Sequence, residues 1–307
     1  PGDVRAAGDL HGGVDAVVAA RGEVDDPRAA GRAPSPWAGI PIGVKDLFDI
    51  AGERTRAGSV VLDDAPPATA TAPAVMRLMR AGFVALGRTN MTEFAFSGLG
   101  VNPHYGTPKS PWDRATGRLP GGSSSGTAVA VADGMGLAAL GTDTGGSCRV
   151  PAAMCGVVGF KPTAARVPLA GVLPLAPSLD SVGPLANTVA DCALLDALMA
   201  GEEDPAPLVP APLGGLRLGI PRGTYMTEDF DATVARVFER TLARLSVAGA
   251  RVELFDLPEL ADISAANATG GFAASESWAW HRRLIAERAD RYDPRILARI
   301  RRGERLG

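Results

Sequence analysis

The stretch PGGSSSGT, residues 120–127, places three serines between glycines, and the apolar run GTAVAVADG (126–134) follows at once. Flexible glycine–serine linkers are usually longer and flanked by other polar residues. A P-loop requires a lysine in the pattern G-x-x-x-x-G-K-[ST], and a dinucleotide site requires G-x-G-x-x-G. Neither pattern occurs in this stretch. The arrangement therefore favours a catalytic loop that leads into a buried helix, and the question is which serine reacts.

Within this stretch, GSSSG (122–126) matches the pattern G-x-S-x-G, with Ser124 at its centre. In α/β-hydrolases that pattern is a nucleophile elbow, which a strand directly precedes and a helix follows. The preceding residues PWDRATGRLP (111–120) do not predict a strand. A triad would also need a downstream histidine, and the candidate is His281, which the charged sequence AWHRR equally explains as a surface or half-buried residue. We therefore expect a different nucleophile and a different base.

A lysine can serve as the base once burial lowers its pKa, because apolar surroundings disfavour the charged ammonium. Lys45 ends the apolar run GIPIGVK (39–45), where the chain is expected to enter the interior. An ordinary lysine at the end of a strand would have the same sequence context. Position alone therefore leaves both interpretations open.

A second glycine–serine stretch, GTDTGGSCR (141–149), follows the apolar run LAAL. Its two glycines allow the backbone to approach a ligand closely. Consecutive backbone N–H groups could converge on one oxygen, as in an oxyanion hole, which stabilises a transition state by a few kcal/mol. The candidate donors are Thr144, Gly145, Gly146 and Ser147. The alternative is a tight turn before a helix.

Composition excludes several classes of protein. The chain has 307 residues, 46% of them hydrophobic, and a formal net charge of −3. This charge does not suit a nucleic-acid partner. The cysteines Cys148, Cys155 and Cys192 lack metal-binding spacing, and such a sparse set is typical of a reduced, cytoplasmic protein. No apolar run reaches the ~18 residues of a membrane span. We expect no cofactor, no metal and no membrane partner.

Strand and helix patterns alternate along the chain. The expected helices span 71–82, 126–134, 187–201, 229–249 and 274–301. The expected strands span 38–46, 83–90, 137–144, 216–221 and 250–258. Such alternation predicts a layered α/β fold, with a mixed, mostly parallel central sheet covered by helices on both faces. We expect a single domain over 1–307 with its core at about 36–200, and the loop 202–215 is interpreted as an excursion.

Taken together, these motifs resemble the amidase signature family of serine hydrolases. The resemblance covers nearly the whole chain, is densest from about 36 to 200, and implies that family's α/β/α fold. The matching segments are GVKD (43–46), PGGSSSG (120–126), GTDTGGSCR (141–149), PAAMCGVVGFKPT (151–163) and PLAPSLDSVGPLANTVADCALL (174–195). So long a glycine–serine block is highly specific to this family.

The family uses a Ser–cisSer–Lys triad, and the matching positions assign its members here. The resemblance implies that Ser147 is the nucleophile, Ser123 the bridging serine after a cis Gly122–Ser123 bond, and Lys45 the base. It further implies an acyl-enzyme mechanism with the oxyanion held by the N–H groups of 144–147.

Supporting roles are expected for other residues of the two loops. We expect Ser124 to support the loop through its hydroxyl and Ser125 to cap the following helix. Asp143 and Arg149 flank the nucleophile and are expected to form an ion pair, with exposure to solvent as the alternative. The Cys148 thiol is expected to serve as a packing group rather than in the chemistry.

The resemblance implies a free-standing amidase that acts on a small-molecule amide, with a homodimer as a possible assembly. An alternative is the A-type, glutamine-hydrolysing subunit of a tRNA-dependent amidotransferase. After KPT (161–163), however, this chain continues AARVPLAGVLPL (164–175), where such subunits have YGRVSRYG. A third interpretation is a non-catalytic scaffold. Family members are longer, so the resemblance implies that this chain lacks most of an N-terminal helical arm and the C-terminal third.

Overall fold

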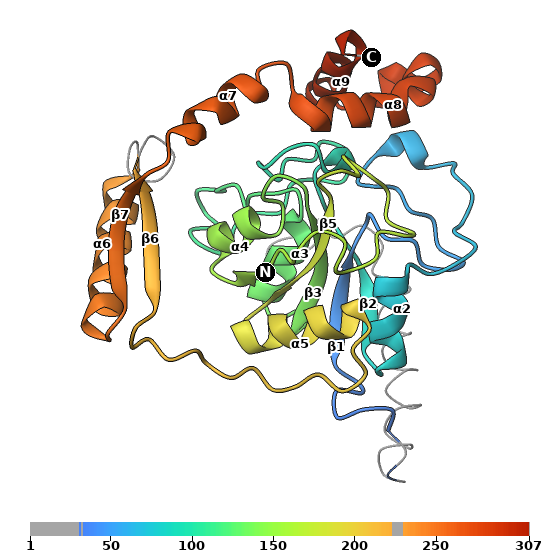
Figure 1. The fold of residues 1–307 in the computed structure, drawn as a ribbon. Coiled ribbons are helices and arrows are strands. Elements are labelled where there is room, and N and C mark those ends of the chain that lie inside the picture. The colour runs from blue at the N-terminus through green and yellow to red at the C-terminus, as the bar shows by residue number, and fades with distance from the viewer. Residues whose placement is uncertain (1–30, 32, 223–229, 307) are drawn as a thin grey trace. The chain divides into compact units, whose positions relative to one another are not determined.

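The computed structural model describes residues 31, 33–222 and 230–306, and Figure 1 shows their fold. The described chain forms two compact units. The first runs to Pro207 and resumes at Phe272, and the second extends from Leu208 to Gly271. The single domain expected over 1–307 stays a prediction. The expected loss of an N-terminal arm concerns residues 1–30, which lie outside the described residues. Residue 229, the first of the helix expected over 229–249, also lies outside them.

The central sheet of the first unit has the strand order β2-β1-β3-β5-β4. Strand β1 pairs in parallel with both β2 and β3, whereas β5 runs antiparallel to β3 and β4. The strands are β1 (Pro41–Lys45), β2 (Val84–Thr89), β3 (Ala138–Asp143), β4 (Val158–Gly159) and β5 (Ser181–Ala186). Because β1 and β3 are parallel neighbours, the residues that follow them emerge at the same edge of the sheet.

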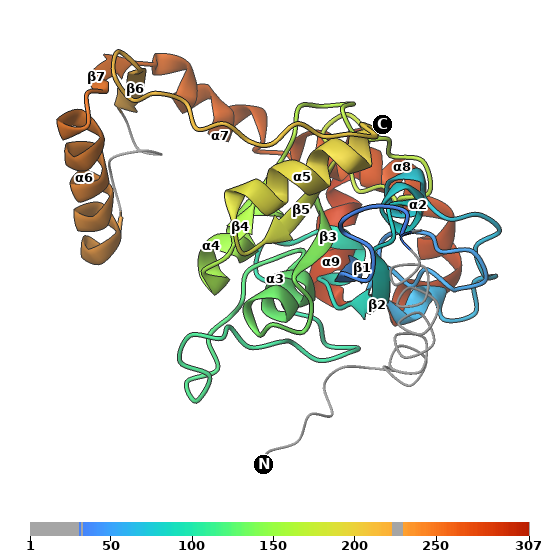
Figure 2. The same cartoon turned by 90° about the horizontal axis from the view of Figure 1, so that it is seen from below.

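Helices cover both faces of this sheet, and Figure 2 shows α3 on the opposite side of the strands from α5. The helices of the unit are α2 (Pro73–Arg80), α3 (Ser125–Ala132), α4 (Arg149–Cys155), α5 (Val189–Ala200), α8 (Gly271–Arg288) and α9 (Pro294–Ile300). Its 3-10 helices are η2 (Val60–Leu62), η3 (Glu93–Ala95), η5 (Ala289–Arg291) and η6 (Arg301–Arg305). The predicted α/β layering is confirmed.

Two hydrophobic clusters follow from the alternation of side chains along the strands. Ala138 and Leu140 of β3 pack in one cluster with α2 and α5, whereas Ala139 packs in the other with α3 and α4. A third cluster joins α8 and α9 to the loops after β1 and β2, and includes Met91 and Phe94. The C-terminal helices are therefore part of the first unit's core.

The ends of α2 and α5 are set by local sequence. Pro73 opens α2, where a missing N–H costs nothing, and Gly82 follows it with φ 91°. Thr188 caps α5 by accepting the N–H of Asp191, and Gly201 ends it with φ 101°. The expected boundaries of both helices are correct to within a few residues.

The sequence analysis missed one helix and two strands of this unit, α4, β4 and β5, and β5 is the longer of the missed strands. It contains Gly183 and Pro184, which usually argue against an interior strand. Gly183 is needed because a Cβ there would lie 2.0 Å from the carbonyl oxygen of Phe160. The single helix expected over 274–301 is instead two helices, α8 and α9, because Pro294 cannot continue a helix and starts α9 after a break.

The second unit contains two parallel strands and a long helix. Strand β6 (Arg217–Arg222) pairs with β7 (Arg251–Asp256), and α6 (Ala232–Val247) lies between them in sequence. The short segments η4 (Pro258–Ala261) and α7 (Asp262–Ala266) follow. No α6 residue is buried. Across the described residues, no helix is both long enough and apolar enough to cross a bilayer.

Candidate active site

Lys45, the last residue of β1, lies at the centre of the candidate site. Its side chain is fully buried, and its Nζ donates hydrogen bonds to Ser123 Oγ at 2.8 Å and to Thr142 Oγ1 at 2.7 Å. Burial lowers the pKa of Lys45 from 10.5 to about 8, although Cys148, Asp143 and Asp180 act in the opposite direction. The lysine can therefore lose its proton near neutral pH.

Ser123 lies in the loop before α3, and the Gly122–Ser123 peptide bond is cis, as the resemblance implies. The Ser123 carbonyl accepts the N–H of Thr92 at 3.1 Å. A Cβ on Gly122 would lie 2.6 Å from the backbone nitrogen of Gly100, so only glycine fits there. The loop is thus held closely against the segment that follows β2.

Ser147 lies between β3 and α4 and is 7% exposed. Its carbonyl accepts the N–H of Ser124 at 3.3 Å, so the two glycine–serine loops are in direct contact. The structure thus brings Lys45, Ser123 and Ser147 into one small region from three distant parts of the sequence.

Asp143 organises the nucleophile loop from its buried position at the end of β3. It accepts the N–H groups of Gly146 at 2.7 Å and Cys148 at 3.0 Å. Arg149 adds a two-pronged ion pair, with Nε and Nη2 at 3.0 and 2.9 Å. Burial alone would raise the pKa of Asp143, but the hydrogen bonds from Arg149 and Cys148 outweigh it and hold that pKa below its usual value.

The backbone donors of this loop differ in availability. The Gly146 N–H is already donated to Asp143, which sequence analysis did not foresee. The N–H groups of Thr144, Gly145 and Ser147 have no acceptor among the described residues. The Thr144 hydroxyl donates to the carboxylate of Asp180. Three of the four expected oxyanion donors are therefore free in this structure.

The remaining serines of the triple have different environments. The Ser124 hydroxyl accepts the N–H of Thr142 at 3.4 Å and lies 3.3 Å from its carbonyl oxygen, which ties the loop to β3. Ser125 was expected as the helix cap, but Ser124 occupies the N-cap position and Ser125 begins α3. The buried Ser125 hydroxyl has no partner among the described residues.

Two contributors were missed by sequence reasoning. Thr142 contacts Lys45 directly, and Asp180 holds Thr144 while also accepting the backbone N–H groups of Leu175 and Ala176. Asp180 arrives there because β5 pairs antiparallel with β3, so that Ser181 lies opposite Asp143. No local pattern in the sequence reveals that pairing.

The nucleophile-elbow interpretation is not supported. Residues 111–121 form turns and irregular structure rather than a strand. His281 is fully buried in α8, where its Nδ1 lies 2.9 Å from the Tyr292 hydroxyl. Burial lowers the pKa of His281 to about 3. It is a neutral core histidine.

Comparison with known proteins decides the family. The Amidase family model matches residues 14–302. The chain belongs to the amidase family. As an amidase-family chain it also matches a crystal structure of an amidase with a TM-score of 0.85 and 35% identity, covering 95% of this chain and 65% of that one. The predicted amidase signature fold is confirmed.

Two curated amidase-family relatives carry more specific names. The chain is 42% identical over 275 residues to the 2-amino-5-chloromuconic acid deaminase of Comamonas testosteroni, covering 88% of this chain and 58% of the relative. It is 42% identical over 289 residues to the A-type subunit of the glutamyl-tRNA(Gln) amidotransferase of Acidobacterium capsulatum, covering 84% and 60%. The chain therefore spans about three-fifths of the length of these relatives.

Proposed function

We propose that this protein is an amidase that hydrolyses a carboxylic amide through Ser147, Ser123 and Lys45. The observation that carries the proposal is the fully buried Lys45, whose amine lies 2.8 Å from the Ser123 hydroxyl. Burial disfavours the charged form of Lys45 and lowers its pKa to about 8, so the neutral amine, which can accept a proton, becomes available near that pH. Serine and lysine replace the serine–histidine pair of other hydrolases.

In the proposed reaction, neutral Lys45 takes the proton of Ser123 as Ser123 takes that of Ser147. The Ser147 oxygen forms a bond to the amide carbonyl carbon, and the carbonyl electron pair moves to the oxygen. Free N–H groups of the 144–147 loop stabilise this oxyanion, with Gly146 left to brace the loop.

Collapse of the intermediate breaks the C–N bond. The proton held by Lys45 returns through Ser123 to the departing nitrogen, which leaves as ammonia or amine. Water then attacks the acyl-enzyme by the same relay and releases the acid. Thr142 holds the Lys45 amine in place, and Ser124 ties the loop of Ser123 to β3, so that the lysine and the bridging serine stay close together.

The proposed substrate is a small linear amide, and the proposed location is the cytoplasm. The similarity to an A-type amidotransferase subunit supports a second candidate, in which glutamine is the amide and partner subunits use the ammonia. The continuation AARVPLAGVLPL (164–175) favours the free-standing amidase. Glutamine-dependent ammonia release that requires partner subunits would favour the second candidate instead.

A screen of simple amides for ammonia release tests the proposal. Ser147→Ala is expected to lower the rate by at least about a thousandfold, because it removes the nucleophile. Ser125→Ala is the matched control, since it removes a buried hydroxyl from the same region that makes no hydrogen bond to any described residue. Ammonia release that is unchanged in Ser147→Ala would exclude Ser147 as the nucleophile.

A further inference from the structure

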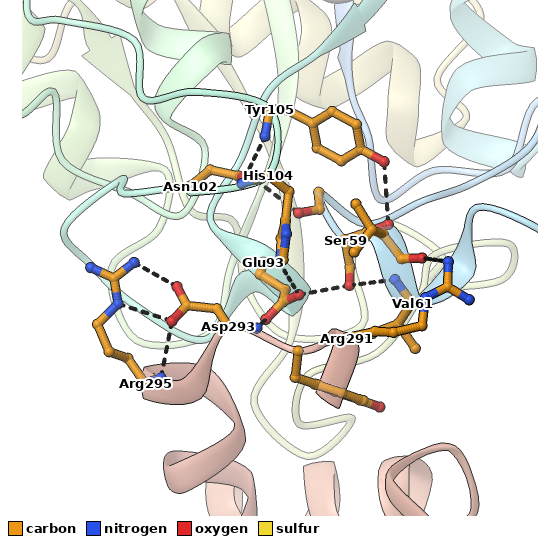
Figure 3. Close-up of polar contacts among 12 residues, drawn as sticks. Ser59, Val61, Glu93, Asn102, His104, Tyr105, Arg291, Asp293 and Arg295 are labelled. Atoms are coloured by element: carbon orange, nitrogen blue, oxygen red, sulfur yellow. Dashed lines mark hydrogen bonds and ion pairs between the residues drawn. The ribbon is translucent and has the colours of Figure 1, made fainter. Parts of the chain in front are cut away.

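A buried carboxylate outside the triad, Glu93, joins three separate segments (Figure 3). Its Oε1 accepts a hydrogen bond from Ser59 Oγ at 2.7 Å and lies 2.8 Å from His104 Nε2. Its Oε2 accepts the backbone N–H of Asp293 at 2.8 Å. The side chain is fully buried, and burial raises the pKa of Glu93, whereas these donors favour the charged form. A buried carboxylate without such donors would be strongly destabilising.

Glu93 lies in a tight turn with an unusual backbone. The next two residues, Phe94 and Ala95, have φ values of 49° and 59°. For residues with a Cβ, each such conformation costs about 1–3 kcal/mol and persists where the surroundings enforce it. On the apolar side, the Phe94 ring packs against His281 and Tyr292, with ring centroids 4.3 and 5.3 Å apart. On the polar side, the contacts of Glu93 provide the constraint.

The same turn holds the loop of Ser123. Thr92, directly before Glu93, donates its N–H to the Ser123 carbonyl at 3.1 Å. On either side, the carbonyls of Asn90 and Gly98 accept the N–H groups of Gly126 at 2.9 Å and Gly122 at 2.8 Å. Residues 90–98 are therefore the surface on which the cis-serine loop is held.

The C-terminal helices approach this turn through polar contacts at two points. Asp293, the N-cap of α9, offers its N–H to Glu93 while its own carboxylate is bound by Arg295, as Figure 3 shows. Further along α9, Arg299 donates to the carbonyl of Phe96 at 2.7 Å. These helices thus bind the turn directly, and among the described residues no hydrogen bond joins them to Ser123 itself.

We propose that Glu93 is a positioning residue for Ser123 and couples helices α8 and α9 to the proton relay. The inference rests on the proposed function, because Ser123 needs exact placement only if it passes a proton between Ser147 and Lys45. Without the three donors converging on Glu93, the turn is expected to relax and to carry the Ser123 carbonyl with it.

Labelling of Ser147 by a fluorophosphonate, which reacts with activated serines, tests the idea without a known substrate. Glu93→Gln keeps the shape of the side chain but removes its negative charge and one of its two acceptor oxygens, which weakens the contacts with Ser59, His104 and Asp293. We expect its maximal labelling rate to fall about 10- to 100-fold, as for a small misplacement of a reacting group. The probe concentration that gives half the maximal rate should stay unchanged, because the nucleophile loop is not altered.

Arg288→Gln is the matched control. Arg288 attaches the same C-terminal helices to the carbonyl of Val61 at 2.9 Å and, among the described residues, makes no hydrogen bond or ion pair with the 92–96 turn. It should lower the melting temperature but leave the labelling rate unchanged. Ser59→Ala removes one donor to Glu93 together with the hydroxyl that accepts the Val61 N–H, and it should give a smaller loss of labelling rate than Glu93→Gln.

The outcomes separate a positioning role of Glu93 from a purely structural role, and both of these from a failure of the proposed function. If Glu93→Gln and Ser59→Ala melt earlier but label at the wild-type rate, Glu93 is only structural and this inference is wrong. If Arg288→Gln loses labelling rate as strongly as Glu93→Gln, general destabilisation explains the effect and the inference is also wrong. If the wild type is not labelled, or Ser147→Ala is labelled equally, the proposed function itself fails.

Discussion

Lys45 carries the proposed chemistry because it is a fully buried lysine whose pKa is lowered to about 8. The base must be neutral, so activity is expected to rise with pH through about 8 and to level off above it. Lys45→Met should abolish this rise together with the activity. A pH–rate profile measured on wild type and Lys45→Met checks this. A rise that persists in the variant would point to another base.

The same shift makes a prediction about stability. The pKa of Lys45 is about 8 in the folded protein, below its ordinary value of 10.5. The unfolded chain therefore binds more protons between these values, and folding is penalised as pH falls through that window. The stability of Lys45→Met relative to wild type should increase as pH is lowered from about 10 to 8. Chemical denaturation at several pH values measures it, and a constant difference would contradict it.

Substitution of Asp180 tests whether nearby carboxylates influence the pKa of Lys45. Its carboxylate raises the pKa of Lys45, against the larger effect of burial. Asp180→Asn should therefore shift the alkaline rise of activity to lower pH, while the amide oxygen can still accept the Thr144 hydroxyl. Asp290→Asn, an exposed charge on the C-terminal segment, is the control. Profiles that superimpose for wild type and Asp180→Asn would refute an electrostatic role.

At the scale of elements, β5 depends on glycine for its close packing. A Cβ on Gly183 would lie 2.0 Å from the Phe160 carbonyl oxygen, so Gly183→Ala must displace the backbone of β5 or of Phe160, which directly follows β4. We expect a loss of about 2–4 kcal/mol in the free energy of unfolding, in the range of strongly destabilising substitutions. Gly98→Ala, where a Cβ meets open space, is the control. Equal melting temperatures for the two variants would argue against the tight contact.

The order of helices and strands was largely predictable, because the spacing of apolar residues and the positions of proline and glycine determine local backbone structure. The patterns around Pro73 and Gly82, and around Thr188 and Gly201, located α2 and α5. Strand β5 was not predictable, because its Gly–Pro sequence argues against an interior strand, and the tertiary structure places it between β3 and β4. The cap of α3 was also misassigned by one residue, because Ser124 is oriented by β3 rather than by its helix.

At the scale of the whole molecule, the two units are joined through an exposed segment. Residues 203–214 have no helix or strand, and Leu208 and Val209 are 52% and 82% exposed. Such segments are preferred sites of proteolytic cleavage. A protease of broad specificity should cut here before it cuts within 41–200, and mass spectrometry of the fragments identifies the site. Early cleavage within the sheet of the first unit would contradict this.

The sequence by itself determined the family and the identity of the three proposed triad residues, because contiguous motifs carry both. It also determined the α/β layering, because helix and strand patterns are local and alternate along the chain. The tertiary structure decided what their neighbours do. Asp180 reaches Thr144 through antiparallel pairing, Thr142 meets Lys45 across adjacent strands, and Glu93 meets Asp293 200 residues away along the chain. Only folding brings such distant groups together, since no local pattern encodes a contact between them.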